Sequence, residues 1–190
     1  ISKKRRFKVN KKIFFKKPLD IINKKKIDIL IEAIGQSDGV SKKIIEAALK
    51  KKIHVVTPNK ALISKHGNYL SKLAEKNKVN LEFEASVGGG IPILRTIKEG
   101  LATNKIDKVY GILNGTCNYI LSEMEITKDS FINVLKKAQN LGYAEPVNPK
   151  LDLNGYDALA KVRILSSLSF NKKISKSPCL MEGIENIETK

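Results

Sequence analysis

The chain has 190 residues, of which 42% are apolar, so it can form one or two domains with a hydrophobic core and is not expected to be disordered. No apolar run approaches the ~18 residues that span a bilayer, and no signal peptide follows the basic start. The two cysteines, Cys117 and Cys179, exclude a disulfide scaffold and a four-cysteine zinc site and fit a reducing compartment such as the cytoplasm.

The net charge of +17 would suit a nucleic-acid-binding protein. However, almost all the basic residues are lysine, and isoleucine and asparagine are abundant too. These three residues have A/T-rich codons, and the charge is spread along the chain, so compositional drift explains it better. We expect no membrane and no specific nucleic-acid partner, with a basic nucleic-acid-binding protein as the alternative.

The first half of the chain alternates between strand and helix patterns. We expect strands over 27–34, 54–57 and 79–85 and helices over 41–50 and 60–76. The run 27–34 is almost continuously apolar, which is typical of a parallel strand buried on both faces. This alternation predicts an α/β fold with a parallel sheet.

The second half is mainly helical. We expect a strand over 107–113 and helices over 91–101, 117–125, 130–141 and 154–170, the last capped by Asn154 or Asp152. A glycine turn precedes the first of these helices, so we place a domain boundary there and predict domains over 1–85 and 86–190.

The usual nucleotide and metal motifs are missing from the printed sequence. The glycines at 88–90 begin a G-x-G-x-x-G pattern, but Ile93 occupies its last position and the turn follows the third strand. No Walker A pattern is present, and His54 and His66 lack the spacing of a metal site.

Ionisable residues gather between 141 and 170. Asp157 and Lys161 are four residues apart and share one face of the predicted helix. A lone pair of this kind is usually a surface ion pair, but the helix is largely apolar, which places the pair near a buried cleft. There a lysine beside carboxylates can act as a proton donor. Glu145, in a loop flanked by glycine and proline, is placed to converge on the same cleft.

A second candidate, Thr57 to Lys60, follows the second strand. Ligands of open parallel sheets bind beyond the carboxyl ends of the strands, where Lys60 can meet a phosphate or a carboxylate. An unrelated surface lysine in a lysine-rich chain remains the alternative.

A third candidate is the segment from Glu84 to Ile91. A glutamate followed by a glycine turn exposes several carbonyls, which suits a hard cation such as sodium or calcium. A tight turn at a strand end is the simpler explanation.

Four segments together resemble the homoserine dehydrogenase family. They are VVTPNKALIS (55–64), EASVGGGIPIL (84–94), GILNGTCNYIL (111–121) and LGYAEP…LDLNGYDALAKVRIL (141–165), and they occur in the family's order and at family-like spacing. The resemblance implies NADP- or NAD-dependent interconversion of L-aspartate 4-semialdehyde and L-homoserine, on the route to threonine and methionine. It also implies a partial Rossmann-type nucleotide-binding domain, then an α+β substrate domain through which the protein forms a homodimer.

The resemblance also implies roles for individual residues. Lys161 would be the proton donor, Glu145 and Asp157 would hold the substrate's ammonium group, and Asp152 would support the lysine. Lys60 would lie beside both cofactor and substrate. The implied cofactor contacts are Gly35, Thr57, Lys60 and Gly142, and the implied structural sodium ligands are Glu84 and the carbonyls of Val87, Gly89 and Ile91.

The sequence departs from the family's pattern at its ends. It starts with Ile1 rather than Met, and the family's first strand, its G-x-G-x-x-G loop and its C-terminal segment are missing from the printed sequence. We therefore expect a fragment that holds most of the substrate site and about half of the cofactor site, and an inactive remnant stays open as an alternative. The loop over 145–152 also looks one residue longer than in the family.

Overall fold

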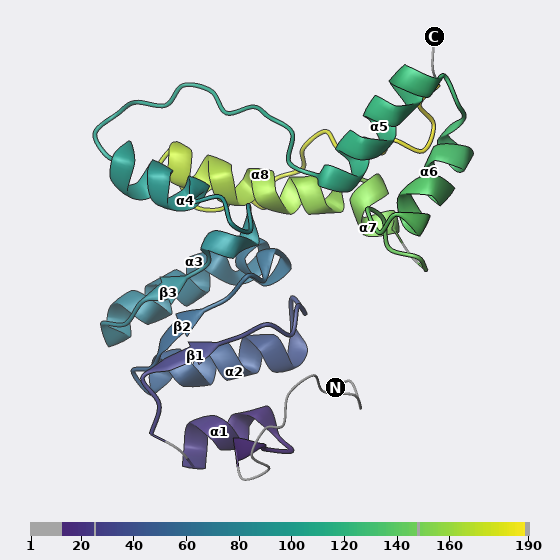
Figure 1. Ribbon diagram of the computed structural model, residues 1–190. Helices are drawn as coiled ribbons and strands as arrows, with labels where there is room; N and C mark the ends of the chain where they lie inside the picture. The colour runs from purple at the N-terminus through teal and green to yellow at the C-terminus, as the bar shows by residue number, and fades with distance from the viewer. Residues whose placement is uncertain (1–12, 25, 148, 189–190) are drawn as a thin grey trace.

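The structure is a computed structural model that describes residues 13–24, 26–147 and 149–188. Its sheet contains β1 (Ile29–Ile31), β2 (His54–Val56) and β3 (Leu81–Glu82), which are parallel and lie in the order β1-β2-β3 (Figure 1). Leu30 is paired with Val55, and Val55 with Leu81. The predicted α/β fold with a parallel sheet is confirmed.

Helices cover one face of this sheet. The crossover helices are α2 (Gly39–Lys50) and α3 (Lys60–Asn77), and α1 (Pro18–Lys24) packs on α2. The apolar face predicted for α2 is buried: Ile44, Ile45, Ala48 and Leu49. The prediction that β1 is buried on both faces is wrong, because Leu30 is buried whereas Ile29 and Ile31 are exposed on the uncovered face.

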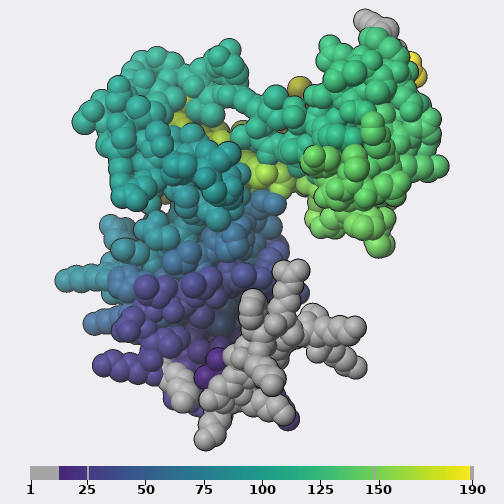
Figure 2. Space-filling model, in the orientation of Figure 1, coloured from purple at the N-terminus to yellow at the C-terminus, as the bar shows by residue number. Residues whose placement is uncertain are grey.

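The second half is built around one long helix, α8 (Tyr156–Ser169), which packs on α3 (Figure 1). Before it come η2 (Glu84–Ser86), α4 (Ile93–Arg95), which continues as the π-helical turn η3 (Thr96–Gly100), α5 (Gly115–Thr127), α6 (Phe131–Asn140) and α7 (Lys150–Leu153). Figure 2 shows the sheet and its helices as one lobe and α5–α7 as another, bridged by the yellow-green surface of α8.

Two further local predictions are wrong. Residues 107–113 form an extended loop, not a strand, because no other described strand lies beside them to form a hydrogen-bonded ladder. Neither Asn154 nor Asp152 caps α8: Gly155 occupies the N-cap position with φ +82° and has no side chain to donate or accept.

Two hydrophobic clusters hold the molecule together. The larger contains residues from α2, α3 and the strands, and also Leu94, Ile97, Ile164 and Leu165 from the second half. The smaller joins α5 to α6 and α7 through Ile120, Met124, Val134, Ala138 and Leu153. The larger cluster crosses the boundary predicted near residue 85, which itself stays a prediction. Within the described residues, no helix is both long and apolar enough to cross a membrane.

Candidate active site

The turn after β2 delivers a lysine to the junction between the lobes. Asn59 caps α3 by accepting a hydrogen bond from the Leu62 amide through Oδ1 (3.1 Å), so the helix begins at Lys60. The Lys60 ammonium then lies 2.5 Å from Asp157 Oδ1 on α8. A residue of the first half thus meets the ionisable stretch of the second, although 97 positions separate them in the chain.

Asp157 and Lys161 form the pair that the sequence predicts on one helix face, with Nζ 2.8 Å from Asp157 Oδ2. Their side chains are only 5% and 16% exposed, so this is not a solvated surface pair. Lys161 Nζ also donates to the carbonyl oxygen of Leu113 at 2.7 Å. Lys161 is therefore fixed from two sides and largely shielded from water.

Asn114 connects two carboxylates and was missed as a site residue. Its Nδ2 donates to Asp152 Oδ1 (2.9 Å) and to Asp157 Oδ2 (3.0 Å), while its Oδ1 caps α5 by accepting from the Cys117 amide (2.8 Å). An asparagine between an extended segment and a helix is an N-cap signal, which could have drawn attention to it. We call Lys60, Asn114, Asp152, Asp157 and Lys161 the ionic cluster.

The electrostatics of the cluster depend on its buried carboxylate. Burial by itself raises the pKa of Asp157, but hydrogen bonds from Lys161, Lys60 and Asn114 outweigh it and leave the pKa below its ordinary value. Asp157 is therefore ionised at neutral pH. Cys117 lies nearby and donates to the Asp152 carbonyl at 3.4 Å. Burial, with the charges of Asp152 and Asp157, raises the pKa of its thiol, which keeps the sulfur protonated.

The structure does not join Glu145 to the cluster. Glu145 is exposed in the loop between α6 and α7, and Gln139 Nε2 donates to its backbone carbonyl. Among the described residues, no hydrogen bond or ion pair links its carboxylate to Lys161 or Asp157. Gly142, at the start of that loop, has φ +80° and open space where a Cβ would be.

A second buried carboxylate, which sequence reasoning also missed, lies at the end of β1. Glu32 is 2% exposed, and its carboxylate accepts from the Ile34 and Gly35 amides, the Thr57 hydroxyl and Asn59 Nδ2. A charged residue inside the apolar run 27–34 was the available signal. We call these five residues the Glu32 network.

The Glu84 turn uses its carboxylate to start a helix. Glu84 Oε1 and Oε2 accept from the Leu94 and Arg95 amides at 2.8 and 2.9 Å. The Ile91 carbonyl accepts from the Ile93 amide, whereas the carbonyls of Val87 and Gly89 accept no hydrogen bond from any described residue. The carbonyls of Val87 and Gly89 can still bind a cation. The Glu84 carboxylate and the Ile91 carbonyl can also do so through the lone pairs that their hydrogen bonds leave unused. Within the described residues, no group of three or more acidic, histidine or cysteine side chains could hold a metal ion.

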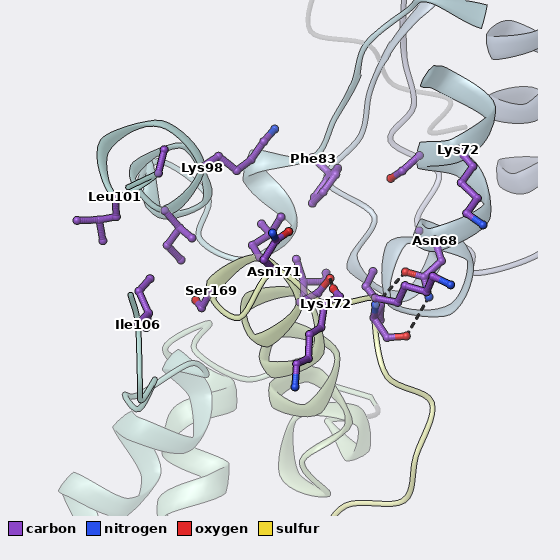
Figure 3. Close-up of a pocket in the computed structure, with 18 of the residues that line it drawn as sticks. Asn68, Lys72, Phe83, Lys98, Leu101, Ile106, Ser169, Asn171 and Lys172 are labelled. Atoms are coloured by element: carbon purple, nitrogen blue, oxygen red, sulfur yellow. Dashed lines mark hydrogen bonds between the residues drawn. The ribbon is translucent and has the colours of Figure 1, made fainter. Parts of the chain in front are cut away.

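A large cavity lies elsewhere. It measures about 780 Å³, opens between α3, η3 and the end of α8, and is lined by residues such as Asn68, Lys72, Phe83, Lys98 and Lys172 (Figure 3). No member of the ionic cluster lines it. We place the site at the ionic cluster, because that is where buried opposite charges meet.

Both halves of the chain match known protein families. Residues 1–84 match the NAD binding domain of homoserine dehydrogenase, and residues 92–190 match homoserine dehydrogenase. The chain is 42% identical to a homoserine dehydrogenase from Neisseria gonorrhoeae over 93% of this chain and 40% of that protein. With the enzyme from Bacillus subtilis it shares 40% identity over 98% of this chain and 43% of that protein.

Solved structures agree with these matches. A homoserine dehydrogenase from Thiobacillus denitrificans superposes with a TM-score of 0.86 at 40% identity, over 91% of this chain and 40% of that one. A hyperthermophilic archaeal homoserine dehydrogenase mutant in complex with NADPH gives 0.80 at 26% identity, over 90% of this chain and 52% of that one. The chain spans about two fifths of the length of the two curated relatives.

Proposed function

Since the chain belongs to the homoserine dehydrogenase family, we propose that the protein interconverts L-aspartate 4-semialdehyde and L-homoserine with NADP or NAD as cofactor. The observation that carries this proposal is Lys161, a shielded ammonium group fixed between Asp157 and the Leu113 carbonyl. Such a group can hold a proton ready for an oxygen atom that gains negative charge.

The proton chemistry follows from the position of Lys161. A nicotinamide cofactor bound in its reduced form would supply a hydride to the aldehyde carbon of the substrate. The carbonyl oxygen then gains negative charge, and Lys161 donates a proton from Nζ to it, which completes the alcohol. In the reverse direction the neutral amine accepts the proton of the alcohol. The Leu113 carbonyl and Asp157 orient the ammonium group in both directions.

Asp157 fits best as the residue that holds the lysines. Oδ1 faces Lys60, and Oδ2 accepts from both Lys161 and Asn114, so the carboxylate already has three partners. In the ionic cluster, the two positive charges of the lysines balance the two negative charges of the aspartates. We assign the ammonium group of the substrate to the exposed Glu145 instead, whose carboxylate in the adjoining loop is paired with none of the described residues.

The cofactor is proposed to lie across the carboxyl edge of the sheet. Gly35 follows β1 with φ +87° and open space where a Cβ would be, and Thr57 and Lys60 follow β2. Ligands of open α/β sheets bind beyond this edge, and glycine permits close approach of the backbone. Lys60 is 42% exposed and can also contact bound anionic groups. Quenching of NADPH and NADH fluorescence, compared side by side, measures the preference between them.

A sodium ion at the Glu84 turn belongs to the same proposal. The oxygen donors of Glu84, Val87, Gly89 and Ile91 are of the kind that hard cations prefer. Its role would be to fix the turn. Equal melting temperatures in sodium chloride and choline chloride of the same ionic strength would contradict it.

Homodimer formation and a cytoplasmic location complete the proposal. Tyr110 and Ile112 are exposed in the extended segment 107–113, an apolar surface that a second copy could cover. Light scattering of the protein as it elutes from a size-exclusion column gives the oligomeric state. A monomer at micromolar concentration would contradict the dimer.

The activity is tested with Lys161→Met in the whole protein. Methionine keeps most of the side-chain length and removes the proton donor, so kcat for homoserine-dependent reduction of NADP or NAD should fall by roughly 10²–10⁴-fold. The matched control is Lys76→Met, at an exposed position of α3. Wild-type turnover in Lys161→Met would overturn the assignment, and absence of turnover in both the wild type and the control would overturn the proposed function.

A further inference from the structure

Glu32 accepts four hydrogen bonds from two separate turns. Oε1 accepts from the amides of Ile34 and Gly35, at 2.7 and 3.3 Å, in the turn after β1. Oε2 accepts from the Thr57 hydroxyl at 2.6 Å and from Asn59 Nδ2 at 3.4 Å, in the turn after β2. The carboxylate thus connects the carboxyl ends of two neighbouring strands.

The directions of these bonds suit an ionised carboxylate. Amide nitrogens can only donate, and the Thr57 hydroxyl donates to Glu32 Oε2 while it accepts from the Asn59 amide at 3.1 Å. All four partners are therefore donors. Burial by itself raises the pKa of Glu32, but hydrogen bonds, chiefly from the Thr57 hydroxyl and the Ile34 amide, outweigh it and hold the pKa below its ordinary value.

The network continues into the ionic cluster through Asn59. Its Nδ2 donates to Glu32 and, at 2.8 Å, to the Gln36 carbonyl, while Oδ1 caps α3. These bonds fix the side chain of Asn59, which immediately precedes Lys60 in the chain. The position of the Lys60 backbone, and hence the reach of its ammonium to Asp157, follows from that cap.

We propose that Glu32 is a positioning residue that aligns the turn at Gly35 with Lys60, and so fixes the cofactor-facing edge of the sheet relative to the proton-donating cluster. This inference rests on the proposed function, because that function places both turns beside the cofactor. Glu32 itself does not touch substrate or cofactor; it acts through Gly35 and Lys60.

The test substitutes Glu32→Gln and compares it with Glu46→Gln, the same change at a carboxylate on α2 that pairs with Lys42. A glutamine must turn its NH₂ group toward one pair of donors, so the hydrogen bonds of that pair are broken or reversed with little change in shape. Two quantities are measured in the whole protein: the kinetic constants, and the titration of the Asp157 carboxyl carbon by NMR without cofactor.

We expect Glu32→Gln to lower kcat/KM for the nicotinamide cofactor roughly tenfold or more, as for a buried donor left unsatisfied. We also expect the pKa of Asp157 to rise toward its ordinary value, because Lys60 is less well held. Glu46→Gln should change neither quantity. A Glu32→Gln protein that melts earlier but keeps the wild-type kcat/KM and Asp157 titration would overturn the inference, since its role would then be structural only.

The two proposals fail in different ways. If the wild type neither binds nor turns over the cofactor, the proposed function fails, while the Asp157 titration still decides whether Glu32 positions Lys60. If Glu32→Gln does not fold, Asn59→Ser decides instead. Serine can still cap α3 but lacks the amide that reaches Glu32. An unchanged Asp157 titration in Asn59→Ser overturns the inference, and a raised pKa supports it.

Discussion

The sheet lobe and the α8 junction each bury one carboxylate, but with different partners. Glu32, at the end of β1, is satisfied by neutral donors: two amides, a hydroxyl and a carboxamide. Asp157, on α8, is held chiefly by two lysine ammonium groups. Neutral donors cannot give up their protons near neutral pH, whereas an ammonium group can. On the roles proposed above, the comparison separates a carboxylate that fixes geometry from one that organises a proton donor.

The largest effect should come from removing the charge between the two lysines. In Asp157→Asn the ammonium groups of Lys60 and Lys161 lose their shared counter-ion, and breaking a buried pair in this way costs about 3 kcal/mol of unfolding free energy. Urea unfolding measures it. Asp107→Asn, in an exposed pair with Lys105, is the matched control and should have no measurable effect. Equal losses in both variants would show that Asp157 is no more than a surface partner.

Acid should weaken the contribution of both carboxylates, with a smaller effect. Both have folded-state pKa values below the ordinary 4.5 of glutamate and 3.8 of aspartate. The stability that the two ionised carboxylates give to the folded state is therefore fully present at pH values above those ordinary pKa values. It is lost as the pH falls through each folded-state pKa. Unfolding free energies measured from neutral to acidic pH should fall less steeply in Glu32→Gln and in Asp157→Asn than in the wild type. Curves parallel to the wild type would mean that neither group is linked to folding.

The smallest predicted effect concerns the two glycines that flank the α7 region. Both have positive φ, but a Cβ at Gly155 would lie 3.1 Å from Met181 Cγ and 3.3 Å from the Glu182 carbonyl, whereas Gly142 has open space. Gly155→Ala should lower the unfolding free energy by about 2 kcal/mol and Gly142→Ala by about 1 kcal/mol. Thermal unfolding distinguishes them. If Gly142→Ala lowered the unfolding free energy more than Gly155→Ala, the N-terminal end of α8 would adapt to a Cβ more easily than the loop does.

The sequence predicted those elements whose pattern is local. Helices α2, α3, α5, α6 and α8 follow from apolar periodicity, and each begins or ends within a few residues of its predicted position. The segment 107–113 did not, because β-branched and aromatic residues favour a strand only when a neighbouring strand is present.

The candidate site shows the same limit. The Asp157–Lys161 pair could be predicted, since helical spacing alone places both residues on one face. Glu32 and Asn114 could not be assigned from spacing, because their partners come from other strands and helices. A buried polar residue becomes recognisable only when the topology shows which donors surround it.

The bond between Lys161 and Leu113 has a consequence for how this chain can vary. The acceptor is a backbone carbonyl, so no substitution of the Leu113 side chain deletes it, provided that the loop keeps its course. The Ile34 and Gly35 amides serve Glu32 in the same way. Anchors made by the main chain therefore depend on the course of the backbone more than on the residue type at these positions. Within these contacts only Lys161 and Glu32 contribute side chains, so only substitutions at these two positions remove them directly.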